Sequence, residues 1–137
     1  MPLLTWKDEY SVNNEELDSH HKILIATLNA LYAECLEIDS EGCAGPKLDA
    51  FLAFADYHFT AEEEYMRRIQ YYEIDGHIEQ PRGFRYKLAE MKRIRYGSEI
   101  ELTRELITFI GKWLLHHVFE EDRKYAQHAL SVVKDPD

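Results

Sequence analysis

Six polar side chains occupy positions where a helical bundle would normally place leucine or isoleucine. They are His21, His58, Glu62, His77, His117 and Asp122. Burying a charged group is costly unless the group is paired or bound to a metal, so two acids on apolar stripes need an explanation. Imidazole and carboxylate ligands together suit iron, manganese or zinc. Because each of two carboxylates can bridge a pair of ions, the set favours a dinuclear metal centre over a single ion.

The spacing of these residues determines which of them can face the same way. His58 and Glu62 are one helical turn apart, so their side chains lie on one face of a helix. His117 and Asp122 are five residues apart, or about 140° around a regular helix, and cannot both point inward. The apolar stripe shifts its phase at the same place. One extra residue accommodated as a π-bulge would turn both side chains inward, so we predict a π-bulge there.

Four long segments with helical periodicity must position these side chains. Their apolar residues recur at spacings of three and four, and glycine and proline are concentrated at the breaks between them. We predict helices over residues 14–39 and 46–70, a third helical segment reaching residue 95, and a fourth helix over residues 98–133 that begins at Ser98. Helices of this length joined by short breaks pack as antiparallel neighbours. The expected fold is an all-α, antiparallel up-down-up-down four-helix bundle with an N-terminal arm, forming one domain over residues 1–137.

Composition and charge restrict the partners of this bundle. The chain carries 16 Lys+Arg against 26 Asp+Glu, a net charge of −10, which argues against binding to nucleic acid or to an anionic membrane surface. No stretch approaches the ~18 apolar residues of a membrane span, and the N-terminus has no basic segment followed by an apolar run. We therefore expect a monomer in the cytoplasm that binds neither nucleic acid nor membranes.

Three motifs resemble those of the bacterial hemerythrins. The string LDSHHKIL, beginning at Leu17, resembles their first-helix motif, and HFTAEEEYM, beginning at His58, resembles their second-helix His-x-x-x-Glu motif. WLLHHVFEED, ending at Asp122, resembles their fourth-helix His-x-x-x-x-Asp motif, and the segment around Trp6 is similar to their N-terminal arm. The resemblance covers nearly the whole chain and implies a non-haem centre of two iron ions, bridged by carboxylates and an oxo or hydroxo group, that binds dioxygen.

The resemblance also implies a role for each candidate ligand. His21 and His58 would bind the iron that has an open coordination position for dioxygen or another small diatomic ligand. Glu62 and Asp122 would bridge the two irons. His77 and His117 would bind the second iron.

At one position the chain departs from the family pattern. Hemerythrins have a further histidine ligand four residues after His77, and this chain has Pro81 there. Because proline inside a helix removes a hydrogen bond and clashes with the preceding turn, we expect the third helix to begin near Pro81 and His77 to lie on a preceding loop. Three outcomes follow, in order of preference: a dinuclear site completed by water or a nearby side chain such as Gln80, a site that is often mononuclear, or a vestigial site.

The function that we predict is dioxygen binding for storage, delivery or sensing. No general base, nucleophile or substrate cleft is visible, so an enzyme is not the first choice. The alternatives are an oxidoreductase that reacts with peroxide or nitric oxide through the same metals, and a metal-depleted bundle that acts as an interaction module. The remaining histidines, His20, His116 and His128, lie off the apolar stripes, and we predict that they are surface residues.

Overall fold

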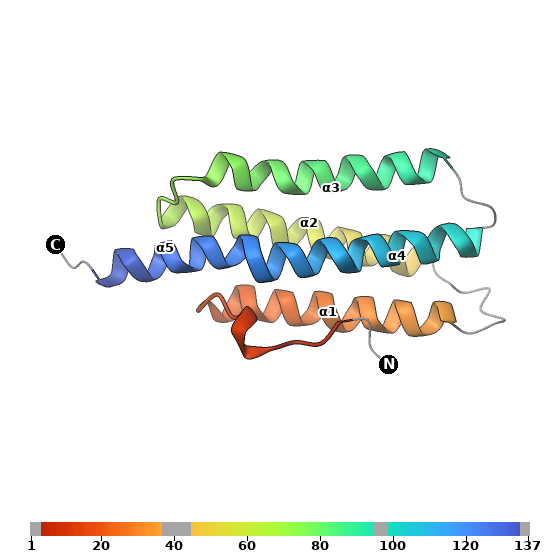
Figure 1. The fold of residues 1–137 in the computed structure, drawn as a ribbon, viewed down its shortest axis with the longest axis horizontal. Helices are drawn as coiled ribbons and strands as arrows, with labels where there is room; N and C mark the ends of the chain where they lie inside the picture. Colours follow the sequence, from red (N-terminus) through yellow and green to blue (C-terminus); the bar gives the residue numbers. More distant parts are fainter. Residues whose placement is uncertain (1–3, 37–44, 95–98, 135–137) are drawn as a thin grey trace.

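The computed structural model describes residues 4–36, 45–94 and 99–134. Its helices are α1 (Glu15–Leu36), α2 (Gly45–Arg68), α3 (Ile74–Ile94), α4 (Glu99–His116) and α5 (Asp122–Lys134). A π-helical segment, η2 (His117–Glu121), joins α4 to α5, so these three form one continuous rod (Figure 1). Successive rods run in opposite directions, which confirms the predicted antiparallel four-helix bundle. The predicted helix ends near residues 39 and 98 lie outside the described residues.

Two apolar clusters hold the rods together. The six candidate ligands lie where the two clusters meet along the rods. Leu24, Leu28 and Ile110 belong to the larger cluster, whereas Leu17 and Tyr125 belong to the smaller one, and all five are at most 2% exposed. On α1 the three leucines recur at the spacings that keep one face of a helix against its neighbours. The polar residues between the clusters are therefore surrounded by low-dielectric packing, which strengthens any charge interaction among them.

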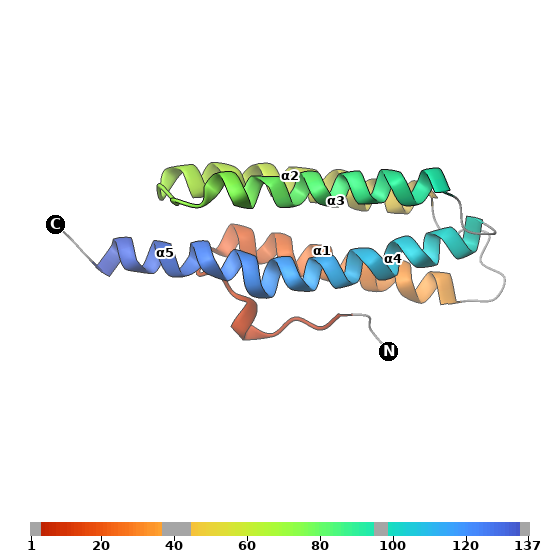
Figure 2. The same cartoon turned by 45° about the horizontal axis from the view of Figure 1, so that its top comes forward.

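The N-terminal arm packs against the outside of the bundle, as the sequence led us to expect. It contains one short 3-10 helix, η1 (Asp8–Tyr10), and runs on the side of α1 away from α2 and α3 (Figure 2). The side-chain amide of Asn29 donates to the Leu4 carbonyl at 2.6 Å, and its oxygen accepts from the Leu4 amide at 2.8 Å. The ring of Tyr10 meets that of Phe119 edge to face at 5.5 Å. These contacts fix the arm beside the π-helical segment.

The structure corrects the expected start of the third helix. α3 begins at Ile74 and passes through both His77 and Pro81, so His77 does not lie on a loop. The backbone amide of His77 donates to the Glu73 carbonyl at 3.1 Å. The helix continues through Pro81 because one register buries His77, Pro81 and Phe84 on the same face. Burial of that face outweighs the hydrogen bond that proline cannot make.

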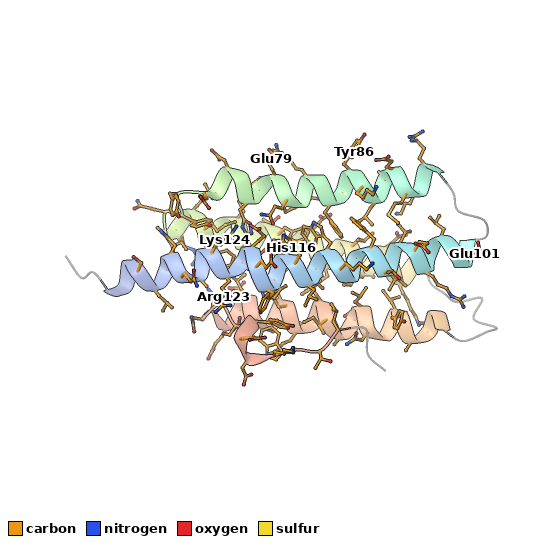
Figure 3. All side chains as sticks on the ribbon, in the orientation of Figure 1. Glu79, Tyr86, Glu101, His116, Arg123 and Lys124 are labelled. Atoms are coloured by element: carbon orange, nitrogen blue, oxygen red, sulfur yellow. The ribbon has the colours of Figure 1, made fainter. Side chains whose placement is uncertain are left out.

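The opposite face of α3 is solvated. Glu79 and Tyr86 project from its outer side, away from the other helices (Figure 3), and Tyr86 is 72% exposed.

Within the described residues, no helix is long and apolar enough to cross a membrane.

Candidate metal centre

The structure brings all six candidate ligands together in the middle of the bundle. One comes from α1, two from α2, one from α3, one from the π-helical segment and one from the start of α5. The six are His21, His58, Glu62, His77, His117 and Asp122, each at most 5% exposed. Their nitrogen and oxygen atoms divide into two groups that could each hold a metal ion, with every atom of a group within 4.8 Å of the others.

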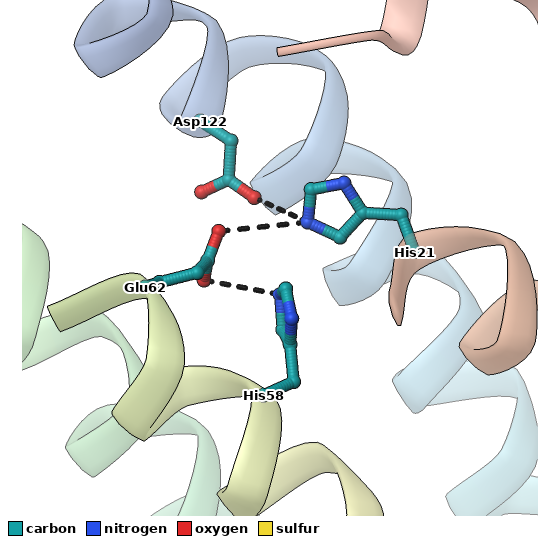
Figure 4. A group of neighbouring side chains, drawn as sticks. All are labelled: His21, His58, Glu62 and Asp122. Carbon is teal, nitrogen blue, oxygen red and sulfur yellow. Dashed lines mark ion pairs between the residues drawn. The ribbon is translucent and has the colours of Figure 1, made fainter. Parts of the chain in front are cut away.

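The first group contains His21, His58 and the two carboxylates (Figure 4). His21 Nε2 lies 3.0 Å from Asp122 Oδ2 and 3.5 Å from Glu62 Oε2. His58 Nε2 lies 3.2 Å from Glu62 Oε1. Two imidazoles and two carboxylates thus face one small volume between α1, α2 and α5.

The second group uses the same two carboxylates with the other two histidines. His77 Nε2 lies 3.0 Å from Asp122 Oδ1. His117 Nε2 lies 2.9 Å from Glu62 Oε1 and 3.0 Å from Asp122 Oδ1. Because Glu62 and Asp122 belong to both groups, the arrangement matches a pair of ions bridged by two carboxylates rather than two separate sites.

These atoms are close together, but most of them do not satisfy one another as hydrogen-bond partners. In the described part of the chain, six buried atoms have no hydrogen-bond partner: His21 Nδ1 and Nε2, His58 Nε2, His77 Nε2, and both Asp122 oxygens. Buried polar groups are normally paired, so a cluster of unpaired ones needs an explanation. All of these atoms except His21 Nδ1 face the shared volume, and lone pairs that converge in this way fit metal ions. Carboxylate oxygens with imidazole nitrogens suit iron, manganese or zinc.

The π-helical segment makes the fourth rod contribute two ligands. It spans His117–Glu121, and the Asp122 amide donates to the His117 carbonyl five residues back. The wider turn places His117 and Asp122 on the same side, where both are fully buried. The π-bulge predicted from the five-residue spacing is therefore confirmed.

The charges of the site are strongly coupled. Burial alone would lower the pKa of His21 and His117, but the nearby carboxylates of Asp122 and Glu62 raise these pKa values to about 9 and about 10. Burial would raise the pKa of Glu62, yet the surrounding histidines, His58 and His117 foremost, hold it well below its usual range. Burial and the Glu62 charge would raise the pKa of Asp122, yet His117 and His21 lower it. Both acids are therefore anionic, as bridging ligands must be, and a bound cation would take the place of the protons that now balance them.

Two further residues support the ligands from outside the cluster. The Tyr125 hydroxyl donates to Glu62 Oε2 at 2.8 Å. The Gln80 side-chain oxygen lies 3.3 Å from His117 Nδ1, and its amide donates to Glu121 Oε2 at 2.7 Å. Gln80 therefore orients the His117 ring from the side away from the carboxylates. In this geometry its side chain is directed at His117 and Glu121, and the expectation that it could complete the metal site stays a prediction.

His20 is not the surface residue that its position off the stripe suggested. It is 7% exposed, and its Nδ1 lies 3.1 Å from Nδ1 of His58. Its ring meets the rings of Phe54 and Tyr57 at 5.6 and 5.4 Å. A rotation of about 100° from the seam points a side chain into the contact between neighbouring helices rather than into water. The sequence carried only one signal for this, the adjacent pair of histidines.

The other two histidines differ in their surroundings. His116 is exposed, as predicted, and pairs with Glu120 at 3.0 Å. His128 is partly buried, with its Nε2 2.9 Å from the carbonyl of Ile69. It therefore links α5 to the end of α2 and is not a free surface group.

Replacing His20 with phenylalanine is expected to lower the free energy of unfolding by about 1–3 kcal/mol, because His58 Nδ1 would lose its buried partner. The ring volume is kept, so the loss reports the hydrogen bond more than the packing. Denaturant unfolding of the metal-free protein measures it. His116→Phe is the matched control. Its imidazole is exposed and its ion pair with Glu120 is solvated on both sides, so the substitution should change the value by less than about 0.5 kcal/mol. Equal effects of the two substitutions would contradict the role assigned to His20.

Comparison with known proteins decides the family. The profile described as "Hemerythrin HHE cation binding domain" matches residues 12–129, which include all six clustered residues. The chain belongs to the hemerythrin family. Its hemerythrin domain is all-α, and the family binds a non-haem di-iron centre that takes up dioxygen.

Individual relatives are similar along almost the whole hemerythrin domain. A bacteriohemerythrin of Stenotrophomonas maltophilia is 28% identical over 126 residues, covering 92% of this chain and 81% of the relative. A bacteriohemerythrin of Clostridium acetobutylicum is 26% identical over 129 residues, covering 90% and 98%. A myohemerythrin of Theromyzon tessulatum is 28% identical over 120 residues, covering 88% of both chains.

Proposed function

We propose that the domain binds dioxygen at two iron ions held by the six clustered residues. One ion takes His21 and His58, the other takes His77 and His117, and Glu62 and Asp122 bridge them. The observation that carries the proposal is the pair of ligand groups that share both carboxylates. The unpaired buried nitrogens and oxygens of the same residues support it.

Iron in this centre would supply the electrons that reversible uptake of dioxygen requires. The chain supplies the surroundings. Trp113 stacks on His117 at 4.7 Å, and Phe59 contacts the same ring edge to face at 5.6 Å. Val118 and Leu114 are at most 3% exposed beside it. This apolar wall excludes water and holds the imidazole in place, and the exclusion of water and its protons would slow the oxidation of the ferrous centre by dioxygen.

Iron content and the reaction with oxygen test the proposal. The protein reconstituted with ferrous iron should hold about two irons per chain, and exposure to dioxygen should produce a visible absorption band that disappears when oxygen is removed. A band that cannot be reversed would favour the alternative, an oxidoreductase acting on peroxide or nitric oxide. Iron near zero in reconstituted protein would contradict both and leave a bundle that acts as an interaction module.

We also propose that the domain acts as a monomer that binds neither nucleic acid nor membranes. Its net charge of −10 opposes association with polyanions and with further copies of itself. Light scattering on the purified protein measures the mass directly, and a mass near twice 16.2 kDa would contradict the proposal. The cytoplasmic location stays a prediction.

A further inference from the structure

A partly enclosed cavity of about 210 Å³ lies between α2 and α3 and reaches the metal ligands. Its floor includes Glu62 and His77, which are 1% and 5% exposed. Pro81 forms part of the same buried floor. The exposed side chains of Arg82 and Arg85 are on its rim. The cavity therefore connects the surface with the ligand group of His77 and His117.

Pro81 determines what this cavity can do. It lies one helical turn after His77 and on the same face, where a side chain with a donor atom would reach an ion bound by His77. The proline ring has no such atom. Gln80, the adjacent polar side chain, is engaged with His117 and Glu121. An atom that completes the coordination of this ion must therefore come from outside the chain, and the cavity provides its route.

The charge of the loaded centre selects the kind of ligand. Two ferric ions carry six positive charges. Glu62 and Asp122 offset two of them and an oxo or hydroxo bridge offsets one or two more, and because histidines bind metals in their neutral form an excess of positive charge remains. The excess positive charge in an apolar interior attracts an anion. On the rim, the Arg82 and Arg85 guanidiniums pair at 2.9 and 2.8 Å with Glu79 and Asp56.

The rim pairs leave the cavity open to an anion. The Glu79 and Asp56 side chains are 66% and 57% exposed, so both carboxylates are well solvated. The third charged rim residue, Glu63, forms an ion pair with Arg67. The Arg82 and Arg85 side chains are themselves 67% and 48% exposed, so water screens the rim charges of both signs, and the positive centre supplies the attraction for an anion.

We propose that this cavity is a binding site for a small monovalent anion at the iron held by His77 and His117. The inference rests on the proposed di-iron centre and adds a second exogenous ligand to it. One anion would bind at the iron of His21 and His58, where the resemblance to hemerythrins implies the open position for dioxygen. The other enters beside Pro81 and takes the coordination position that the proline leaves without a protein ligand.

Azide binding to the diferric protein tests the inference, with iron content measured in the same samples. Infrared spectra of bound azide and a titration followed by visible absorption should show two azides per pair of irons. In Pro81→His, where an imidazole fills the cavity, one azide should bind and the second infrared band should be lost. If the unsubstituted protein and Pro81→His each hold two irons but bind a single azide, the anion site beside Pro81 is overturned while the proposed di-iron centre stands. Fewer than two irons in the unsubstituted protein would instead contradict the proposed di-iron centre, and with it this site.

A rim substitution tests the route without altering a ligand. Arg82→Glu should slow association of the second azide by about tenfold at low salt, because a positive charge at the entrance becomes negative. Association of the first azide should stay unchanged. Arg93→Glu makes the same change on the exposed surface of α3, about three helical turns from Arg82 and two from Arg85, and is the matched control. Equal rates in the Arg82 and Arg93 variants would overturn the proposed entrance.

Discussion

Replacing Glu62 with glutamine is expected to remove both irons from the protein, whereas replacing His77 with alanine is expected to remove only one. This result is expected because Glu62 belongs to both ligand groups and His77 belongs to one. Glutamine keeps the shape of the side chain and can still accept the hydrogen bond from Tyr125, but it lacks the negative charge that holds two cations together. Loss of a supporting residue already weakens metal affinity by about 10–100-fold, so loss of a bridging charge should exceed the upper figure.

Iron per chain after dialysis against a weak chelator measures both effects. Glu63→Gln is the matched control, since Glu63 is the next residue on α2 and pairs with Arg67 on the outside of the helix. It should keep two irons. Retention of two irons by Glu62→Gln would show that Glu62 does not bridge them. Loss of both irons in His77→Ala would show that the second ion is needed to hold the first.

The parts of this site that were predictable from sequence depend on spacing along single helices. Apolar residues three and four apart predicted the bundle, and polar residues at the same positions predicted the cluster. The π-bulge followed because His117 and Asp122 are five residues apart, which a regular helix cannot turn to one side. These features depend only on spacing within one helix, so a single sequence is enough to predict them.

The features that sequence analysis missed depend on how the rods pack. His20 lies off the stripe of its own helix, and only the position of α2 brings its ring onto His58. Gln80 faces His117 only because α3 and the fourth rod are neighbours. Pro81 was expected to start a helix because its intrinsic preference was weighed without the burial of the α3 face. Tertiary packing overrides local preference in each case.

Replacing Pro81 with alanine is expected to raise the free energy of unfolding of the metal-free protein by about 2 kcal/mol. Pro81 is the eighth residue of α3, well past the first turn, so it leaves the His77 carbonyl without its helical donor. Removing proline from a helix interior raises the free energy of unfolding by about 3 kcal/mol. The greater conformational freedom of the unfolded chain lowers it again by up to about 1 kcal/mol. Alanine supplies no metal ligand, so the change reports the helix and the packing of its buried face rather than metal binding.

Denaturant unfolding of the metal-free variant measures this change, with Ala89→Pro as the converse control. Ala89 is exposed on the same helix, two turns further on, and proline there should lower the free energy of unfolding by about 3 kcal/mol. If the two substitutions change the free energy of unfolding in opposite directions, Pro81 lies inside a continuous helix. A loss of stability in Pro81→Ala would mean that α3 begins at Pro81, because proline is favoured in a first turn. His77 would then precede the helix, and the second ligand group would need iron to form.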